Sequence, residues 1–196
     1  QLIPSEVESA VKNVEDFSII SNCVTVVIVQ IKEVMDVFNE SNEKLDTIMS
    51  SIDNIAKSYP QFIKLRTLFD IVIYIGGLFT TENDSSNSVH TNGSIEFSKQ
   101  IKEELNKLLL KQLDPTYSRF TICINTGGPV ACYTTGKSYK SFEVVGGIID
   151  ESFRILAAAP PDSIIITEAT KELLNQENIE GMNNGPAVFD QNTYLL

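Results

Sequence analysis

The stretch FIKLRTLFDIVIYIGGLF, residues 62–79, decides the fold of this chain. It contains two runs of mainly β-branched and other apolar residues, 62–68 and 71–77, joined at Phe69-Asp70. Two such runs with a short join between them are typical of a β-hairpin. The acid at the join is either a turn residue that caps the hairpin or a carboxylate with a function.

The segments around this hairpin alternate between extended and helical patterns. Residues 23–31, CVTVVIVQI, are almost continuously apolar and β-branched, which predicts a strand buried on both faces. Apolar residues at helical spacing predict one helix over 37–58 and another over 95–113. The polar residues 80–94 predict a loop between the hairpin and the second helix, and the only histidine, His90, lies in that loop.

The second half of the chain continues the alternation. FTICIN (120–125) and VACYTT (130–135) predict two strands that form a hairpin around the turn at 126–129. Further strands and helices are predicted at 141–147 (strand), 148–159 (helix), 163–167 (strand), 168–175 (helix) and in the final NTYLL. The order β-α-β-β-α-β predicts an α+β domain with a ferredoxin-like split βαβ core, an antiparallel sheet with helices on one face.

Length and charge limit the organisation and the partners. With 196 residues, 42% of them hydrophobic, the chain is long enough for one domain, which we place at 23–196. Residues 1–22 are expected to be a leading helix (5–20) and a linker from a longer protein. A net charge of −11 argues against nucleic acid and anionic membrane surfaces as partners. Three cysteines without CxxC spacing are expected to be buried thiols in a reducing compartment.

The ordered set of segments resembles the catalytic domain of the class III adenylate and guanylate cyclases. VTVVIVQIKEV (24–34) is similar to the family's first strand, and KLRTLFD (64–70) to its KxxTIGD segment. FTICINTGGPVACYTTG (120–136) resembles RIGIHTGPVVAGVVG, with one extra Gly in the turn. FEVVGGIIDESFRILAAAPPDSIIITEATKELL (142–174) resembles the segment that follows. The likeness covers residues 23–174 in order.

The resemblance implies a chemistry. A class III cyclase uses two divalent ions, Mg²⁺ or Mn²⁺, held by two carboxylates, to make the ribose 3′-oxygen of ATP or GTP attack the α-phosphate. An Arg stabilises the developing charge, an Asn orients the ribose and a Lys binds the phosphates. The site lies between two paired domains, so a second cyclase-like domain, identical or related, is the implied partner.

Carried over residue by residue, the resemblance places Asp70 at one metal position and Gln30 at the other, where a neutral amide replaces the family's Asp. Arg154 occupies the position of the family's transition-state Arg, and Asp150 replaces the ribose-orienting Asn. An alternative for Arg154 is a surface pair with Asp150 at i, i+4 spacing on one helix. The phosphate-binding Lys has no counterpart, because the last lysine of the chain is Lys171.

The two positions that read the base in this family are matched by Arg66 and Glu143. They keep the basic-then-acidic order of adenylate cyclases. The alternative is a buried ion pair that fills an emptied pocket, which suits the planar guanidinium of Arg. These two interpretations stay open at this point.

Two functions therefore remain. The first is a catalytically impaired cyclase-homology domain that acts in dimerisation or regulation in intracellular signalling. The second is one half of a heterodimeric adenylate or guanylate cyclase, which donates Arg154 to a site whose carboxylates come from its partner. Both imply a cytoplasmic domain, with any membrane anchor lying outside this piece of chain, since no apolar run of about 18 residues is present.

Overall fold

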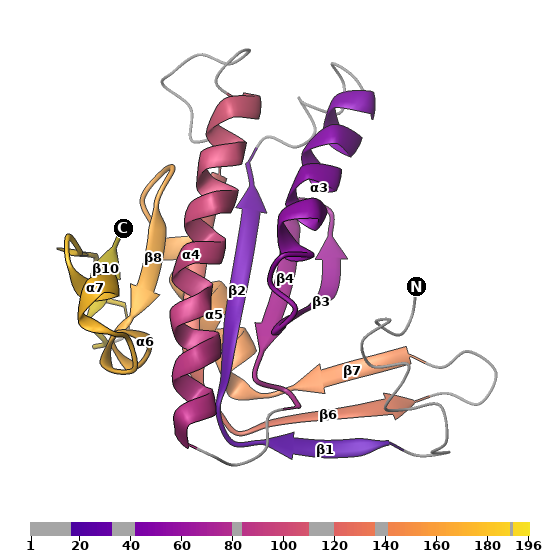
Figure 1. Cartoon of the computed structure of the whole chain (residues 1–196), viewed down its shortest axis with the longest axis vertical. Coiled ribbons are helices and arrows are strands. Elements are labelled where there is room, and N and C mark those ends of the chain that lie inside the picture. Colours follow the sequence, from indigo (N-terminus) through magenta and orange to yellow (C-terminus); the bar gives the residue numbers. More distant parts are fainter. Residues whose placement is uncertain (1–16, 33–41, 80–83, 110–119, 136–140, 189) are drawn as a thin grey trace.

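The computed structural model describes residues 17–32, 42–79, 84–109, 120–135, 141–188 and 190–196 (Figure 1). Its strands are β1 (Ser18–Ser21), β2 (Val24–Ile31), β3 (Phe62–Leu68), β4 (Ile71–Gly76), β5 (Phe120–Gly127), β6 (Val130–Thr135), β7 (Ser141–Val145), β8 (Ile164–Thr167), β9 (Asn183–Asn184) and β10 (Thr193–Leu195). Its helices are α3 (Asn42–Ala56), α4 (Asp84–Leu109), α5 (Gly147–Ala158), α6 (Glu168–Glu172) and α7 (Gln176–Ile179).

A seven-stranded sheet, in the order β3-β4-β2-β5-β8-β10-β9, forms the centre of the molecule. Its strand pairs are antiparallel except β5 with β8, which run parallel. Strand β2 pairs with β4 on one side and β5 on the other, and Val26, Val27 and Ile28 are completely buried. The predicted two-faced strand and the predicted hairpin of β3 and β4 are thus confirmed.

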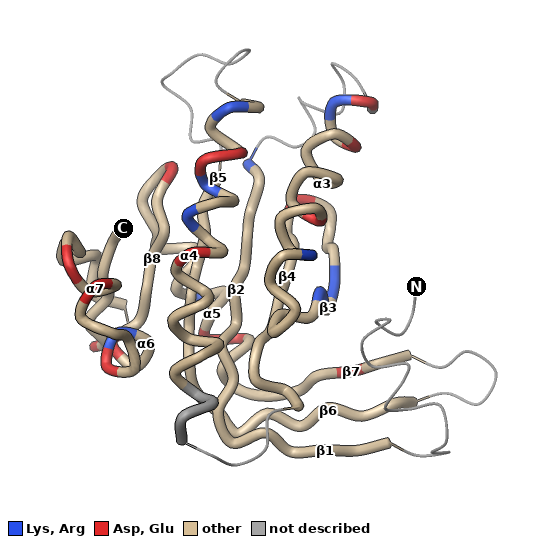
Figure 2. The backbone as a smooth tube through the Cα atoms, in the orientation of Figure 1, with Lys and Arg blue, Asp and Glu red and all other residues tan. Residues whose placement is uncertain are grey.

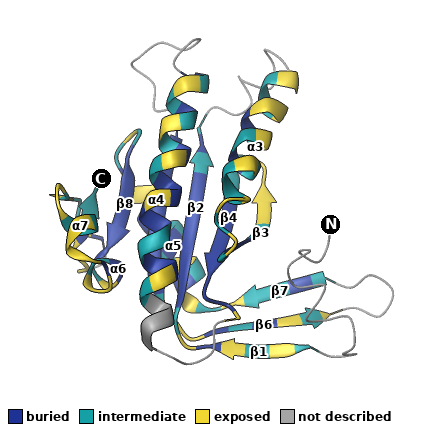
Figure 3. Cartoon of the chain, in the orientation of Figure 1, coloured by how far each residue is buried: buried dark blue, intermediate teal, exposed yellow. Residues whose placement is uncertain are grey.

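Successive residues of β2 point to opposite faces of the sheet, and each face has its own core. Val27 and Val29 pack with Ile48 of α3 and with α4, whereas Val26 and Ile28 pack with Ile155 of α5. The predicted α+β class with an antiparallel-rich sheet is confirmed. The helices, however, cover both faces rather than one, with α3 and α4 on one side and α5 on the other (Figures 1 and 3).

A second, three-stranded sheet, β1-β6-β7, projects from the first and is called the arm below (Figure 1). The predicted hairpin at 126–129 is wrong, because β6 does not return along β5 but pairs with β1 and β7. The adjacent strands β2 and β5 both bend here, and their continuations β1 and β6 stay paired, with Ser21 opposite Val130. At the bend a Cβ on Gly128 would lie 2.2 Å from the Asn22 carbonyl oxygen. The two segments of the chain can therefore pass each other here only because residue 128 has no side chain.

Helix α4 begins at Asp84, so the predicted loop is wrong over 84–94, and residues 80–83 lie outside the described residues. Three polar side chains of this segment, His90, Thr91 and Ser94, are buried in a polar part of the core. His90 and Thr91 are 1% and 0% exposed, and the Thr25 hydroxyl on β2 lies 2.8 Å from His90 Nδ1 and 3.0 Å from the Thr126 hydroxyl. Polarity here reflects a hydrogen-bonded core rather than contact with solvent.

The expected leading helix over 5–20 is also wrong at its end, because Ser18–Ser21 form a strand, and residues 5–16 lie outside the described residues. Helix α3 covers the described part of the predicted helix 37–58 as far as Ala56, and residues 110–113 of the other predicted helix are likewise not described. The remaining predicted strands and helices are found within one or two residues of their expected ends, except that the helix predicted over 168–175 ends three residues early, at Glu172.

The three cysteines are free thiols, with Cys123 and Cys132 buried and Cys23 half-buried. Burial raises the pKa of the Cys132 thiol to about 11, so this thiol stays protonated at neutral pH. Among the described helices, none is both long and apolar enough to cross a membrane.

The burial of His90 predicts a pH-dependent stability. Its Nε2 has no hydrogen-bond partner among the described residues, and burial lowers the pKa of the ring to about 4. The unfolded chain takes up this proton near pH 6.5 and the folded one only near pH 4, so the free energy of unfolding falls as the pH drops through this window. The loss is at most about 1.4 kcal/mol per pH unit, and about 3 kcal/mol in all.

The measurement is urea unfolding at intervals between pH 5 and 7, for the wild type and for His90→Asn, which keeps a polar nitrogen for Thr25. His90 is the only histidine of the chain. In the variant the free energy of unfolding should therefore depend much less on pH in this window, whatever the absolute stability of the variant. Equal slopes in the two proteins would contradict the assignment of the proton to His90.

Candidate functional site

Gln30 and Asp70, distant in the sequence, are neighbours at one end of the large sheet. Gln30 lies on β2 opposite Ile71, the first residue of β4, and Asp70 directly precedes that residue. Gln30 Nε2 donates to Asp70 Oδ2 at 2.8 Å, and the Ile31 amide donates to the Asp70 carbonyl at 2.7 Å. Both side chains are half-buried. The hairpin therefore brings the two predicted metal positions together, while their role stays a prediction.

This pair does not fit a two-metal centre. Divalent ions such as Mg²⁺ take oxygen ligands, chiefly carboxylates, whereas here an amide N–H is directed at the single carboxylate. In the part of the chain that the structure describes, no three His, Cys, Asp or Glu side chains are grouped so that they could hold a metal ion.

Arg66 and Glu143 join the two sheets. Arg66 lies on β3 at the edge of the large sheet and Glu143 on β7 of the arm, and Arg66 Nη2 donates to Glu143 Oε2. In the charge-coloured trace of Figure 2, β3 carries basic residues and β7 an acidic one. The side chains of Arg66 and Glu143 are 51% and 31% exposed, so the pair is not the buried one considered from the sequence. Exposed ion pairs contribute about 0–1 kcal/mol to the free energy of unfolding. This pair therefore adds little stability, and its main effect is to hold a positive and a negative charge together where the two sheets meet.

Behind this ion pair lies an apolar cavity of about 170 Å³, called the notch cavity. Its wall is formed by β3, β4, β7 and α5. The lining residues are Leu65, Arg66, Leu68, Ile73, Phe142, Glu143, Val144, Ile149 and Phe153. A flat apolar group of the size of an aromatic ring suits such a space, and among the described residues the charged side chains that line it are those of the ion pair.

Helix α5 carries the other two predicted site residues. Asp150 and Arg154 are exposed and lie one helical turn apart, while their neighbours Ile149 and Phe153 line the notch cavity. Arg66 and Glu143 thus line the cavity, whereas Asp150 and Arg154 are not among its lining residues and each directly follows one of them on α5. Gln30 and Asp70 lie apart from its lining, at the ends of β2 and of the β3–β4 turn.

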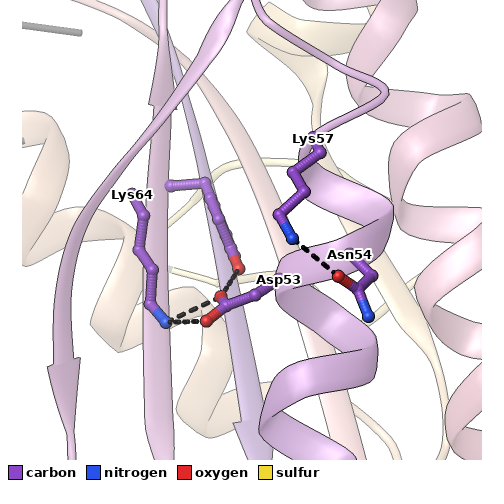
Figure 4. A network of polar contacts seen from close by, with 5 residues as sticks. Asp53, Asn54, Lys57 and Lys64 are labelled. Atoms are coloured by element: carbon purple, nitrogen blue, oxygen red, sulfur yellow. Dashed lines mark hydrogen bonds and ion pairs between the residues drawn. The ribbon is translucent and has the colours of Figure 1, made fainter. Parts of the chain in front are cut away.

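Sequence reasoning missed a second polar group on the opposite face of the sheet (Figure 4). Lys64 Nζ donates to both carboxylate oxygens of Asp53, at 2.7 and 3.0 Å, and the Tyr74 hydroxyl donates to Asp53 at 3.1 Å. Burial, and then the nearby Asp53 charge, raise the pKa of Tyr74. The hairpin places Lys64 opposite Tyr74, so the proximity of these two residues could be predicted from the sequence. The position of Asp53 could not, because it depends on how α3 packs on the sheet.

Comparison with known proteins agrees with this geometry. Residues 18–192 match the sequence profile described as the adenylate and guanylate cyclase catalytic domain. No curated protein matches the chain significantly.

Several solved structures share the fold. The guanylate cyclase domain of RhGC from Catenaria anguillulae, solved in complex with GTP, is 20% identical, with a TM-score of 0.68 over 90% of this chain and 97% of that chain. The adenylyl cyclase CyaB from P. aeruginosa is 16% identical, with a TM-score of 0.68 over 93% and 95% of the two chains. A bacterial light-regulated adenylyl cyclase is 14% identical, with a TM-score of 0.70 over 100% of this chain and 57% of that chain.

At such identities the solved structures support the fold alone, but the sequence match extends from β1 to the residue before β10. The chain therefore belongs to the adenylate and guanylate cyclase catalytic domain family.

Proposed function

We propose that this class III cyclase domain has an incomplete catalytic site of its own and acts in intracellular signalling by pairing with a second cyclase-like domain. The observation that carries the proposal is the hydrogen bond from Gln30 Nε2 to Asp70 Oδ2. A site that binds two divalent ions needs two anionic ligands, and here one ligand is neutral and directs a donor at the other.

The charges that would meet a triphosphate support the same conclusion. Asp150 is exposed one turn before Arg154 on α5, where its carboxylate repels phosphate oxygens. Lys171, the last lysine of the chain, lies over the Tyr194 ring with Nζ 3.5 Å from the ring centroid. Its ammonium is held by that cation–π contact on α6 rather than placed among the residues of the notch cavity.

The open face of the arm supports pairing. Cross-strand partners point to the same face of a sheet, so Ile20, Ala131 and Val145 form one row and Tyr133 lies in the next. On this face Ile20 is 68% exposed, Val145 56% and Tyr133 37%, while Cys132 on the opposite face is buried. Covering these exposed apolar side chains with another protein removes little favourable hydration. Such a face also resembles the centres of protein interfaces, which are depleted in charged residues.

The alternative is that the chain supplies part of a working site in a heterodimer. Arg154 favours it, because this residue is exposed and directly follows Phe153, which lines the notch cavity. In that arrangement a partner with both carboxylates provides the metal site, and Arg154 stabilises charge on the phosphoryl oxygens.

The first test concerns the metal position. Gln30→Asp places a second carboxylate beside Asp70, so without divalent ions we expect the variant to unfold about 1 kcal/mol more easily than the wild type. Mg²⁺ or Mn²⁺ should restore its stability by mass action and leave the wild type unchanged. Thermal unfolding with and without the ions measures this, with the neutral Gln30→Asn as the matched control. Equal stabilisation of the wild type and Gln30→Asp would contradict the interpretation of Gln30.

The second test concerns turnover and nucleotide binding. The purified chain is expected to form neither cyclic AMP nor cyclic GMP above background, and Gln30→Asp is not expected to restore activity, because the Asn and Lys positions remain changed. Calorimetry with ATP and GTP should show weak binding that metal ions do not strengthen. Tight metal-dependent binding, or turnover by the chain alone, would refute the proposal. Turnover that appears only with a cyclase partner, and disappears with Arg154→Ala, would establish the alternative.

The third test concerns pairing. A charge at the fully buried Val130 of β6 would unfold the arm, whereas Tyr133 and Ile20 are exposed on its open face and can carry one. We expect Tyr133→Glu or Ile20→Glu to weaken self-association, or association with a related cyclase domain, by about tenfold or more in sedimentation experiments. Val89→Glu, which alters a 61% exposed residue of α4, is the matched control. A chain that stays monomeric at high concentration and is captured by no cyclase domain would contradict the proposal.

A further inference from the structure

The tip of the β3–β4 hairpin exposes two large apolar side chains. Leu68 is 43% exposed and Phe69 is 66% exposed. Phe69 also has a φ of 54°, in the left-handed region of the backbone. Glycine and asparagine adopt this conformation readily, whereas for a bulky side chain it is a genuine outlier.

Nothing within the described part of this fold compensates for that conformation. A Phe ring stabilises a protein when it is buried, and this ring is largely in solvent. The tip therefore combines backbone strain with an exposed aromatic group, a combination that is typical of functional contacts rather than of stability. Its ring needs a cover from outside the described part of the chain.

The notch cavity has the size and the chemistry for such a ring. Its volume is about 170 Å³ and most of its lining is aliphatic or aromatic. Apolar cavities of roughly 150 Å³ bind benzene. Leu68 lines this cavity while the ring of the next residue, Phe69, is exposed, so the chain does not fill the cavity with its own Phe69.

The cavity carries one cation and one anion, and the cation is the more exposed of the two. Asp70 directly follows Phe69, while Arg66, 51% exposed, stands at the cavity beside its partner Glu143, 31% exposed, so an incoming Asp70 meets the guanidinium more readily than the carboxylate. Two copies of a chain with a net charge of −11 repel each other, so self-association requires a local match of this kind. Glu143 is a cross-strand partner of Tyr133 on the open face of the arm, whereas Phe142 and Val144 line the cavity from the opposite face, so the cavity lies at the edge strand β7, next to the open face.

We propose that Phe69 of one copy of this chain occupies the notch cavity of a second copy. The inference rests on the proposed pairing and names a contact within it. Tip and cavity belong to the same surface, as a two-fold interface requires, so each copy can give and receive a ring. In the paired state the cavity is closed to any other flat ring, including a nucleotide base.

Phe69→Asn separates this role from a structural one, because the two roles move stability in opposite directions. Removing the left-handed Phe should raise the melting temperature of the dilute monomer by about 2–4 °C. The same change should weaken self-association at least about tenfold, since it removes a buried aromatic anchor. Val89→Asn, at another exposed apolar position, should leave association unchanged.

Cross-linking between two variants tests the contact directly. Chains with Phe69→Cys are mixed with chains with Val144→Cys, whose residue lines the notch cavity, and oxidised. A disulfide-linked pair should form in the mixture and not in either variant alone. Mixing Val89→Cys with Val144→Cys, and oxidising the wild type with its three native cysteines, are the controls.

The outcomes distinguish this inference from the pairing on which it rests. If Tyr133→Glu abolishes association while Phe69→Asn does not weaken it and no cross-link forms, the contact of Phe69 is wrong and the pairing stands. If the wild type is monomeric at all concentrations and no cross-link forms, both are wrong. If Phe69→Asn lowers the melting temperature of the monomer, the ring has a structural role and the inference is overturned.

Discussion

The close passage of two chain segments beside Gly128 is the constraint on which most of this structure depends. Strands β2 and β5 are neighbours in the large sheet, and each continues beyond a bend into the arm as β1 and β6. The bend brings Gly128 so near the Asn22 carbonyl that a methyl group would not fit. Because the pair bends as a unit, β7 is placed beside β3, and Glu143 meets Arg66. The notch cavity and the open face of the arm both follow from this placement.

The site shows which parts of a cyclase domain this chain keeps. The scaffold is complete, since both faces of β2 are covered and the Arg66–Glu143 pair joins the two sheets. Under the function proposed above the catalytic charges are incomplete, since Gln30 donates to the carboxylate beside it and Asp150 presents an exposed negative charge. Packing and catalytic chemistry can be separated in this way because replacing a residue at the surface leaves the packed core intact, whereas a two-ion centre fails when a single ligand is lost.

The buried polar residues around His90 reduce the stability of the fold. A buried imidazole nitrogen without a partner among the described residues is unfavourable, and it stays in place because Thr25, Thr91 and Thr126 are tied together beside it. Helix α4 includes His90 and Thr91, whose side chains are buried against Thr25 of β2. The exposed Phe69 is the opposite case, an apolar group outside the core in a backbone conformation that suits a smaller residue.

Local patterns in the sequence determined the secondary structure wherever burial repeats regularly. The continuous apolar run of β2, the two halves of β3 and β4, and the stripe of Ile48 and Ile52 on α3 all report a single periodic environment, so each element was predictable. The adjacency of Gln30 and Asp70 was also predictable, because a hairpin beside a neighbouring strand leaves few arrangements.

The tertiary structure alone decided the remainder. Residues 84–94 were predicted as a loop because polar side chains usually face water, and only the packing of α4 on β2 reveals that His90 and Thr91 are buried. The segment at 126–129 has the composition of a hairpin turn, and only the pairing of β6 with β1 shows that it is a bend. Whether Arg66 and Glu143 form a buried or an exposed pair depends on how far the arm stands from the sheet. These features depend on contacts between residues far apart in the chain, and a local pattern holds no information about such contacts.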